Sequence, residues 1–506
     1  MTYSPRLSSS FNDTYLRSNH ISPQSGMCSF CTEECDGTCE IAIAAVLGQQ
    51  TVYPTNTGNN QVASEKDYPI DFSHFNINGR VFGAIGANPN YEEANIYRVK
   101  LEREYGKYNL VKLSMPIILP ALVKLNWEDY FSGAAMAGVS CVIGEEAMTK
   151  DPNLKIENGK VVEFSYLKNI LDSFRKYYRG YGQIILQCNV EDDMLGLPEY
   201  AIKEHKLEAL EFKFGQGAKG TQPVRRLKNR EEALKKQEMG VLVFPDPMDL
   251  EVIRKFEEGT CPNFYSYGRL PLWDEDYLIP RIQELREMGI KNFYFKMAGY
   301  QIQDLEKVII IGSKAEVDMI TFDGAGGGSG YSPSKMMNEW SLPTILMEDA
   351  VCNIVEKLKA KGDYIPAITI TGGFSSEDHV FKSLALGKGN VTAIGLCRAA
   401  MTAAMTGKRI GNMIKEGNIP KHMKKYGNTV EEIYGDLADL RAIYGKEANG
   451  FSLGAVGVFS YLNKIAFGLK HFAALNRKFD ISYLDRSDLI PLTRDAKDLL
   501  KGRWFE

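Results

Sequence analysis

The spacing of apolar residues predicts parallel strands that end in glycine-rich loops. An apolar run from Val317 leads into a loop with five glycines between Gly324 and Gly330. Two further runs, from Ala367 and from Val391, also end in glycine. Glycine tolerates positive φ, and successive N–H groups in such a loop form a concave site for an anion. We therefore predict phosphate binding by these loops, with a ligand-free turn as the alternative.

Strand-like runs alternate with amphipathic helical segments such as Asp378–Leu386, which indicates an α/β protein with a parallel sheet. Glycine-rich strand tips on one face are typical of a (β/α)8 TIM barrel, whose last two strands commonly hold a phosphate. An open doubly wound sheet is the alternative. The other candidate strands are Met115–Leu122, Val139–Glu146, Gln183–Cys188, Leu207–Lys213, a weak fifth within Val241–Phe244 or Asn263–Tyr267, and Asn292–Lys296. With the three glycine-tipped runs, these make eight or nine candidates for eight barrel strands, so one of them must lie outside the barrel.

The 506 residues suffice for a barrel with accessory parts. We predict an N-terminal extension with a cysteine cluster (residues 1–109), the barrel (110–410) and a helical C-terminal region packed on the barrel (411–506). The net charge of −4 argues against a nucleic-acid partner. No apolar stretch reaches the roughly 20 residues of a membrane span, and the N-terminus does not resemble a signal peptide. We therefore expect a cytoplasmic protein without a membrane partner.

Four of the nine cysteines fall within twelve residues, at Cys28, Cys31, Cys35 and Cys39. Two- and three-residue spacers let thiolates converge on one metal centre. An odd number of cysteines without an export signal argues for thiols and metal ligands rather than disulfides. The short, continuous spacing resembles ferredoxin-type ligation and favours an iron–sulfur cluster of the 4Fe-4S type. Structural zinc sites usually have a longer segment between their two ligand pairs, and zinc is the alternative.

Several motifs occur in an order and spacing that resemble the FMN-binding domain of glutamate synthase. They are Leu197–Tyr200 (L-P-E-Y), Leu210–Lys219 (L-E-F-K-F-G-Q-G-A-K), Phe295–Lys296, the G-G-G-S-G-Y-S-P loop and Thr371–Gly373. The segment Tyr483–Leu489 resembles the closing segment of the same domain. The resemblance covers roughly Met115 to Leu492 and implies a (β/α)8 barrel with FMN at the carboxyl ends of the strands.

The resemblance also implies roles for individual residues. Expected flavin neighbours are Gln187, Lys213 and Lys296, and the expected phosphate cradle is Gly327, Gly328, Ser329, Gly372, Gly373 and Gly395, with Arg398 as an added contact. A lysine beside the flavin would stabilise its anionic reduced form. On the substrate side, Glu145, Lys219 and Gln222 match positions where the family binds 2-oxoglutarate and reduces its imine. Lys219 would pair with a carboxylate and Glu145 would handle protons.

The sequence departs from that family in three respects. Nothing resembles the family's glutaminase domain, so ammonia would come from elsewhere. Of the cysteines expected after the last barrel strand, only Cys397 is in that region, and the N-terminal cysteines would serve electron transfer instead. The usual His-Asp of the later glycine loop is Ala325-Gly326. These changes leave the substrate open.

The sequence-based hypothesis is an FMN-dependent iron–sulfur oxidoreductase that passes electrons from the cluster to FMN and reduces a small substrate, with glutamate synthesis as the leading example. The alternatives are the same barrel acting on another small substrate, or a non-catalytic scaffold subunit with zinc on its four cysteines. Expected partners are the substrate and either a ferredoxin-like electron donor or a separate glutaminase subunit. A homo-oligomer is a further possibility that the sequence does not decide.

Overall fold

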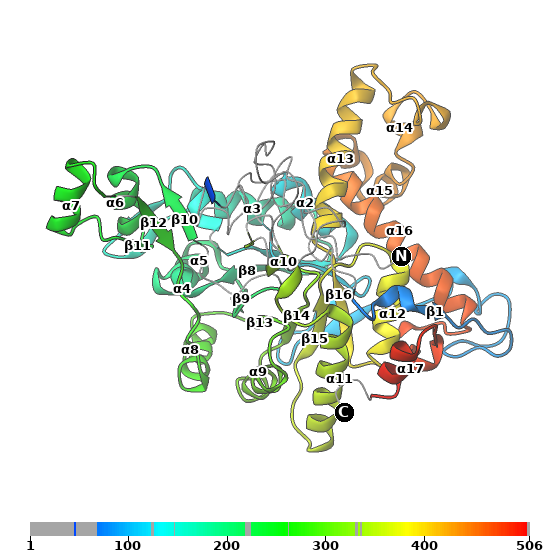
Figure 1. Cartoon of the computed structure of the whole chain (residues 1–506). Helices are drawn as coiled ribbons and strands as arrows, with labels where there is room; N and C mark the ends of the chain where they lie inside the picture. The colour runs from blue at the N-terminus through cyan, green and yellow to red at the C-terminus, as the bar shows by residue number, and fades with distance from the viewer. Residues whose placement is uncertain are drawn as a thin grey trace, which may run out of the picture.

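The computed structural model describes residues 45–46, 68–122, 126–145, 147–217, 224–261, 263–328, 332–333 and 336–502. A closed barrel of eight parallel strands forms its centre (Figure 1). These strands are β4 (Ile117–Leu119), β5 (Ser140–Ile143), β8 (Ile184–Cys188), β9 (Ala209–Lys213), β13 (Asn292–Ala298), β14 (Met319–Asp323), β15 (Ala367–Thr371) and β16 (Val391–Gly395). β16 pairs with β4 and closes the ring. The predicted (β/α)8 barrel is confirmed, and the alternative prediction of an open doubly wound sheet is wrong.

Each barrel strand is followed by at least one helix before the next barrel strand. The helices are α2 (Trp127–Ala137), α3 (Ser165–Arg175), α4 (Val190–Met194), α5 (Leu197–His205), α8 (Glu275–Glu287), α9 (Ile302–Lys314), α10 (Met336–Glu339), α11 (Thr344–Ala360), α12 (Glu377–Leu386) and α13 (Arg398–Lys415). All seven residues of β13 are buried. Helices cover the outer face of a parallel sheet, and this explains why its strands appear in the sequence as continuous apolar runs.

Both segments proposed for the weak fifth barrel strand lie outside the barrel, and this part of the prediction is wrong. They contain β11 (Leu242–Phe244) and β12 (Phe264–Tyr267), which form an antiparallel sheet with β10 (Val224–Leu227). With α6 (Arg230–Glu238) and α7 (Leu250–Glu257), this sheet makes a lobe that projects at the left of Figure 1. Burial along β12 alternates, as in an antiparallel strand with one solvated face. The fifth barrel strand is β13.

The C-terminal region is helical, as predicted, and packs on the barrel. It comprises α14 (Val430–Ile433), α15 (Leu437–Tyr444), α16 (Leu453–Leu475) and α17 (Arg494–Leu500). The long helix α16 contacts α2 and α13. A Cβ atom at Gly457 would lie 2.6 Å from the Ala403 carbonyl oxygen, so the close approach of α16 to α13 requires glycine there. No helix in the described ranges is long and apolar enough to cross a bilayer.

Short strands outside the barrel tie its periphery together. β1 (Phe75–Ile77) pairs with β17 (Leu489–Pro491), so the beginning of the described chain meets its end. β6 (Lys155–Glu157) and β7 (Lys160–Glu163) form a hairpin after β5. β2 (Arg103–Tyr105) and β3 (Val111–Leu113) form a second hairpin that leads directly into β4.

The β2–β3 hairpin closes the amino end of the barrel. Its residues Tyr105, Val111 and Leu113 belong to one apolar cluster with the inward-facing side chains of the barrel strands. The Tyr105 hydroxyl lies 2.8 Å from the Ser140 hydroxyl of β5. Because the described residues fill this end, we expect a ligand site at the carboxyl ends of the strands.

Asp318, immediately before β14, anchors the hairpin to the barrel. Its side chain is fully buried and accepts hydrogen bonds from the backbone N–H groups of Lys107 and Phe293, each at 2.8 Å. Arg286 Nη2 lies 3.5 Å from the same carboxylate. Burial raises the pKa of Asp318, while these hydrogen bonds and Arg286 oppose that shift.

Replacement of Asp318 by alanine should lower the free energy of unfolding by about 3 kcal/mol, because two buried N–H groups lose their acceptor and Arg286 loses its partner. Urea denaturation of the purified variant measures this. Asp172→Ala is the control, because Asp172 forms an exposed ion pair with Lys168 and should change stability by less than about 0.5 kcal/mol. Equal effects of the two substitutions would show that Asp318 does not anchor the hairpin.

Candidate active site

Polar side chains replace apolar ones where the barrel interior reaches the carboxyl ends of the strands. Residues two apart on a strand share a face, so Glu211 and Lys213 point into the barrel together. Gln187 lies opposite Glu211, and Lys296 lies opposite Lys213. We refer to these four residues, together with Glu145 and Asp323, as the polar layer. All of them except Glu145 are at most 5% exposed.

Lys213 is held by an acid that follows β5. Its ammonium forms an ion pair with Glu145 Oε1 and donates to Gln216 Oε1 at 3.1 Å. The side chain of Lys213 is 2% exposed, so a charged partner is needed to keep an ammonium there. The structure thus brings together Lys213, predicted as a flavin neighbour, and Glu145, predicted on the substrate side.

Lys296 is held by Asp323 from the neighbouring strand. Lys296 Nζ lies 3.8 Å from Asp323 Oδ2, which also accepts a hydrogen bond from Gly217 N at 3.0 Å. Burial by itself would lower the pKa of Lys296, but the charges of Asp323 and Glu211 outweigh it, and the pKa is raised. Lys296 is therefore an ammonium at neutral pH, buried next to the open end of the barrel.

Glu211 is the third carboxylate of the polar layer. It is 1% exposed and accepts a hydrogen bond from Gln187 Nε2. Burial raises the pKa of Glu211 to about 7, although Lys296, Gln187 and Lys213 all favour its ionised form. Gln187 Oε1, also buried, has no hydrogen-bond partner among the described residues.

Glycine loops line a cavity of about 180 Å3 beside the polar layer. Its walls include Lys296, Asp323, Gly326–Gly328, Thr371–Gly373, Gly395 and Arg398. Gly372 and Gly373 adopt φ values of 124° and 88°, which side-chain-bearing residues rarely reach. Within the described chain, nothing accepts a hydrogen bond from their N–H groups. These donors are therefore available to an anion.

A helix N-terminus faces the same cavity. Helix α13 begins at Arg398, and its N-cap residue Cys397 makes no side-chain capping bond. Both residues line the cavity. Arg398 Nη2 donates to the Gly326 carbonyl oxygen at 3.2 Å, which places the guanidinium against the glycine loop. The free amide groups of a helix N-terminus attract phosphate. Burial raises the pKa of the Cys397 thiol, so it is neutral.

The residues around this cavity suit the phosphate end of FMN, and the two buried ammonium groups suit a ring system that becomes negatively charged. The glycines leave space for the ligand, and the amide groups of Gly372 and Gly373 with Arg398 supply donors for a phosphate. Lys213 and Lys296 supply fixed positive charge in the polar layer beside the cavity. The donor set therefore fits FMN.

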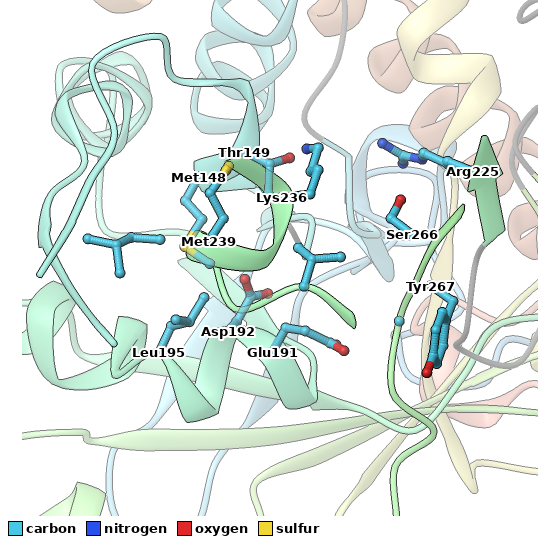
Figure 2. A pocket seen from close by; sticks show the side chains of 13 residues that line it. Met148, Thr149, Glu191, Asp192, Leu195, Arg225, Lys236, Met239, Ser266 and Tyr267 are labelled. Atoms are coloured by element: carbon cyan, nitrogen blue, oxygen red, sulfur yellow. The ribbon is translucent and has the colours of Figure 1, made fainter. Parts of the chain in front are cut away.

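A second cavity lies between the barrel and the lobe. Figure 2 shows Met148, Leu195 and Met239 on one side of it, and Arg225 and Tyr267 from the lobe strands on the other. Its volume is about 50 Å3, enough for a few water molecules and less than a third of the volume of the glycine-lined cavity.

Several predicted residues lie outside the described residues: Lys219, Gln222, Ser329, Cys28, Cys31, Cys35 and Cys39. Their roles stay predictions. Elsewhere in the described ranges, no group of three or more His, Cys, Asp or Glu side chains could hold a metal. Glu211 and Asp323 were not predicted from the sequence. Glu211 could have been recognised, because it alternates with Lys213 on a strand whose tip was already assigned to the site.

Residues 254–408 match the family model described as "Conserved region in glutamate synthase". The sequence matches no curated protein. Among solved structures, a flavocytochrome b2 variant with pyruvate bound is 13% identical, with 85% of this chain and 78% of that chain covered and a TM-score of 0.47. A putative lactate oxidase of Pediococcus acidilactici is 13% identical, with 83% and 84% covered and a TM-score of 0.43. At these values the structural similarities carry no functional argument.

The matched residues include β13 to β16, the glycine loops and Lys296. It confirms the predicted resemblance to the FMN-binding region of glutamate synthase, and with it the prediction of a flavin-dependent oxidoreductase.

Proposed function

We propose that this protein is an iron–sulfur flavoenzyme of the glutamate synthase type, in which a cluster on Cys28, Cys31, Cys35 and Cys39 delivers electrons to FMN and a small substrate is reduced. The reduction of 2-oxoglutarate and ammonia to glutamate is the leading example. The observation that carries the proposal is the pair of buried ammonium groups, Lys213 and Lys296, beside a glycine-lined cavity at the open end of the barrel.

The residues of the proposed site form two groups, one that would bind the phosphate and one that would place positive charge beside the flavin ring. Gly327, Gly328, Gly372, Gly373 and Gly395 would surround the phosphate, with Arg398 and the α13 N-terminus adding positive charge. Lys213 and Lys296 would stabilise negative charge on the ring, because a fixed charge in a buried site requires no reorganisation during the reaction. When bound there, FMN supplies hydride transfer.

Glu145 would act on the substrate side, where it could hold or release a proton. Its ion pair with Lys213 holds the carboxylate at the carboxyl end of the barrel. Lys219 would bind a substrate carboxylate, and Gln222 would add a hydrogen bond. Ala325 and Gly326, in place of the family's usual His-Asp, favour a second candidate, in which the same flavin site reduces a different small substrate.

Electrons and ammonia would come from other proteins. A ferredoxin-like donor suits a cluster close to the N-terminus, and a separate glutaminase subunit would supply ammonia. A cytoplasmic location also stays a prediction.

An anaerobic absorption spectrum of the purified protein, before and after chemical reduction, tests the proposal directly. We expect flavin bands above a broad iron–sulfur absorption that bleaches on reduction, together with iron and acid-labile sulfide. A colourless protein that contains zinc and does not take up added FMN would contradict the proposal and favour the zinc-bound scaffold.

Replacement of Lys296 by methionine should remove positive charge from the flavin site while roughly keeping the side-chain volume. We expect reduced FMN to be disfavoured at least tenfold relative to oxidised FMN, a fall of about 30 mV for a two-electron couple. Spectroelectrochemical titration measures the potential. Lys291→Met is the matched control, because Lys291 lies before the same strand, is 53% exposed and pairs with Glu208. The same potential in both variants would exclude Lys296 as a flavin-stabilising charge.

Substitution of both Cys31 and Cys35 by serine should abolish the cluster, because a four-thiolate site loses half of its ligands. We expect iron and sulfide to disappear, FMN content to remain, and flavin reduction by a ferredoxin-type donor to fail. Cys261→Ser, in the lobe, is the control and should keep all three. Retention of iron in the double variant would exclude these cysteines as ligands, and loss of the fold would indicate a structural metal instead.

A further inference from the structure

The polar layer contains more carboxylates than ammonium groups. Lys213 pairs with Glu145, and Lys296 pairs with Asp323. Each lysine thus has a partner of its own, and no described lysine or arginine forms an ion pair with Glu211. A buried carboxylate without an ion pair is costly, and it commonly binds a proton instead. Glu211 is therefore the group of the layer whose charge can change.

The groups that face Glu211 come from four directions. Lys213 lies on its own strand, Lys296 and Tyr294 on β13, and Gln187 on β8, with Glu145 beyond β5. The lysines and the Gln187 amide favour the carboxylate, whereas burial and Glu145 favour the neutral acid. Burial has the largest effect, and the resulting pKa of about 7 makes both forms of Glu211 accessible at neutral pH.

Gln187 can serve as a partner to either form of Glu211. Its Nε2 donates to the carboxylate, and its Oε1 is the buried atom without a partner in the described chain. If Glu211 is protonated, its O–H can donate to Oε1 after rotation of the amide, because an amide carries a donor and an acceptor at opposite ends. A change of protonation state therefore leaves Glu211 with a hydrogen bond.

We propose that Glu211 is a proton-compensating residue, which binds one solvent proton when FMN in the polar layer is reduced and releases it on reoxidation. This role rests on the proposed function. FMN takes up two electrons and one proton, which gives its anionic reduced form. The Glu211 carboxylate takes up one further proton from solvent and becomes a neutral acid. The electrons come from the chemical reductant in the test, and from the electron donor in the enzyme. Glu211 acts through charge and is a positioning residue.

The direction of the pH dependence follows from the charge. Negative charge arriving next to Glu211 disfavours the carboxylate and raises its pKa. Below pH 7 the residue already holds its proton before reduction, and no uptake occurs. Above pH 7 it is ionised before reduction and protonated afterwards, until the pH exceeds the raised pKa. The extra proton should therefore appear only on the alkaline side of about pH 7.

The test is the pH dependence of the FMN reduction potential in the FMN-loaded full chain and in Glu211→Gln, which has the same shape but cannot ionise. Each proton taken up per two electrons changes the equilibrium constant tenfold per pH unit, or about 30 mV. We expect the wild type to show twice the slope of the variant above pH 7 and the same slope below it. Equal slopes throughout would overturn this role.

Glu348→Gln is the matched control. Glu348 is also a fully buried glutamate, with a hydrogen bond of 2.7 Å from the Ser383 hydroxyl, but it lies on α11 outside the barrel interior. Its variant should keep the wild-type slope. Loss of the extra slope in Glu348→Gln as well would overturn the assignment to Glu211.

A second measurement does not depend on the variant. Proton uptake by the wild type on reduction, followed with a pH indicator one unit above pH 7, should be two protons per FMN, with the absorption spectrum of anionic reduced flavin. One proton, or the spectrum of neutral reduced flavin, would overturn the role of Glu211. Absence of bound flavin would overturn the proposed function itself, and this outcome is distinct from flavin that is reduced with only one proton.

Discussion

The constraint on which the site depends is the burial of two ammonium groups at the one open end of the barrel. Moving an ion out of water costs several kcal/mol even after relaxation, and a close carboxylate is the usual compensation. Glu145 is the close carboxylate for Lys213, and Asp323 is the close carboxylate for Lys296. Asp323 also accepts the N–H of Gly217, so the second ion pair fixes the start of the loop after β9. The charges that suit a flavin thus also position the segments around it.

The same strands carry polar groups at both ends, with different consequences. At the amino end, Asp318 and Asn292 hold the β2–β3 hairpin: Asn292 exchanges hydrogen bonds with Asn109, and Asp318 accepts the N–H of Lys107. These groups use one another and backbone amides, and they seal the barrel. At the carboxyl end, Gln187 Oε1 has no hydrogen-bond donor in the described chain. The N–H groups of Gly372 and Gly373 have no acceptor there. These groups at the carboxyl end are therefore available to a ligand.

The fold could be predicted because buried parallel strands appear in the sequence as continuous apolar runs that end in glycine, and β14, β15 and β16 follow this pattern. The fifth strand was assigned wrongly because β11 and β12 are also short apolar runs, and only pairing partners reveal that they belong to the lobe. The ion pair between Lys213 and Glu145 was not predictable, since it depends on how residues 68 positions apart meet across the barrel. Asp323 was missed because an acid before a glycine loop is also an ordinary turn residue.

The position of Asp323 bears on how the proposed flavin site would select a substrate. Where the related family has His-Asp in the later glycine loop, this chain has Ala325 and Gly326, and its acid lies at the end of β14, beneath the loop. Asp323 is buried and occupied by Lys296 and Gly217, so its charge supports the lysine. Along this wall the cavity is lined by glycines, which present backbone amides rather than an acid and a base. The fixed charges that suit FMN are therefore present without the His-Asp pair of the family, so substrate selection in the proposed enzyme would depend on other segments around the carboxyl ends of the strands.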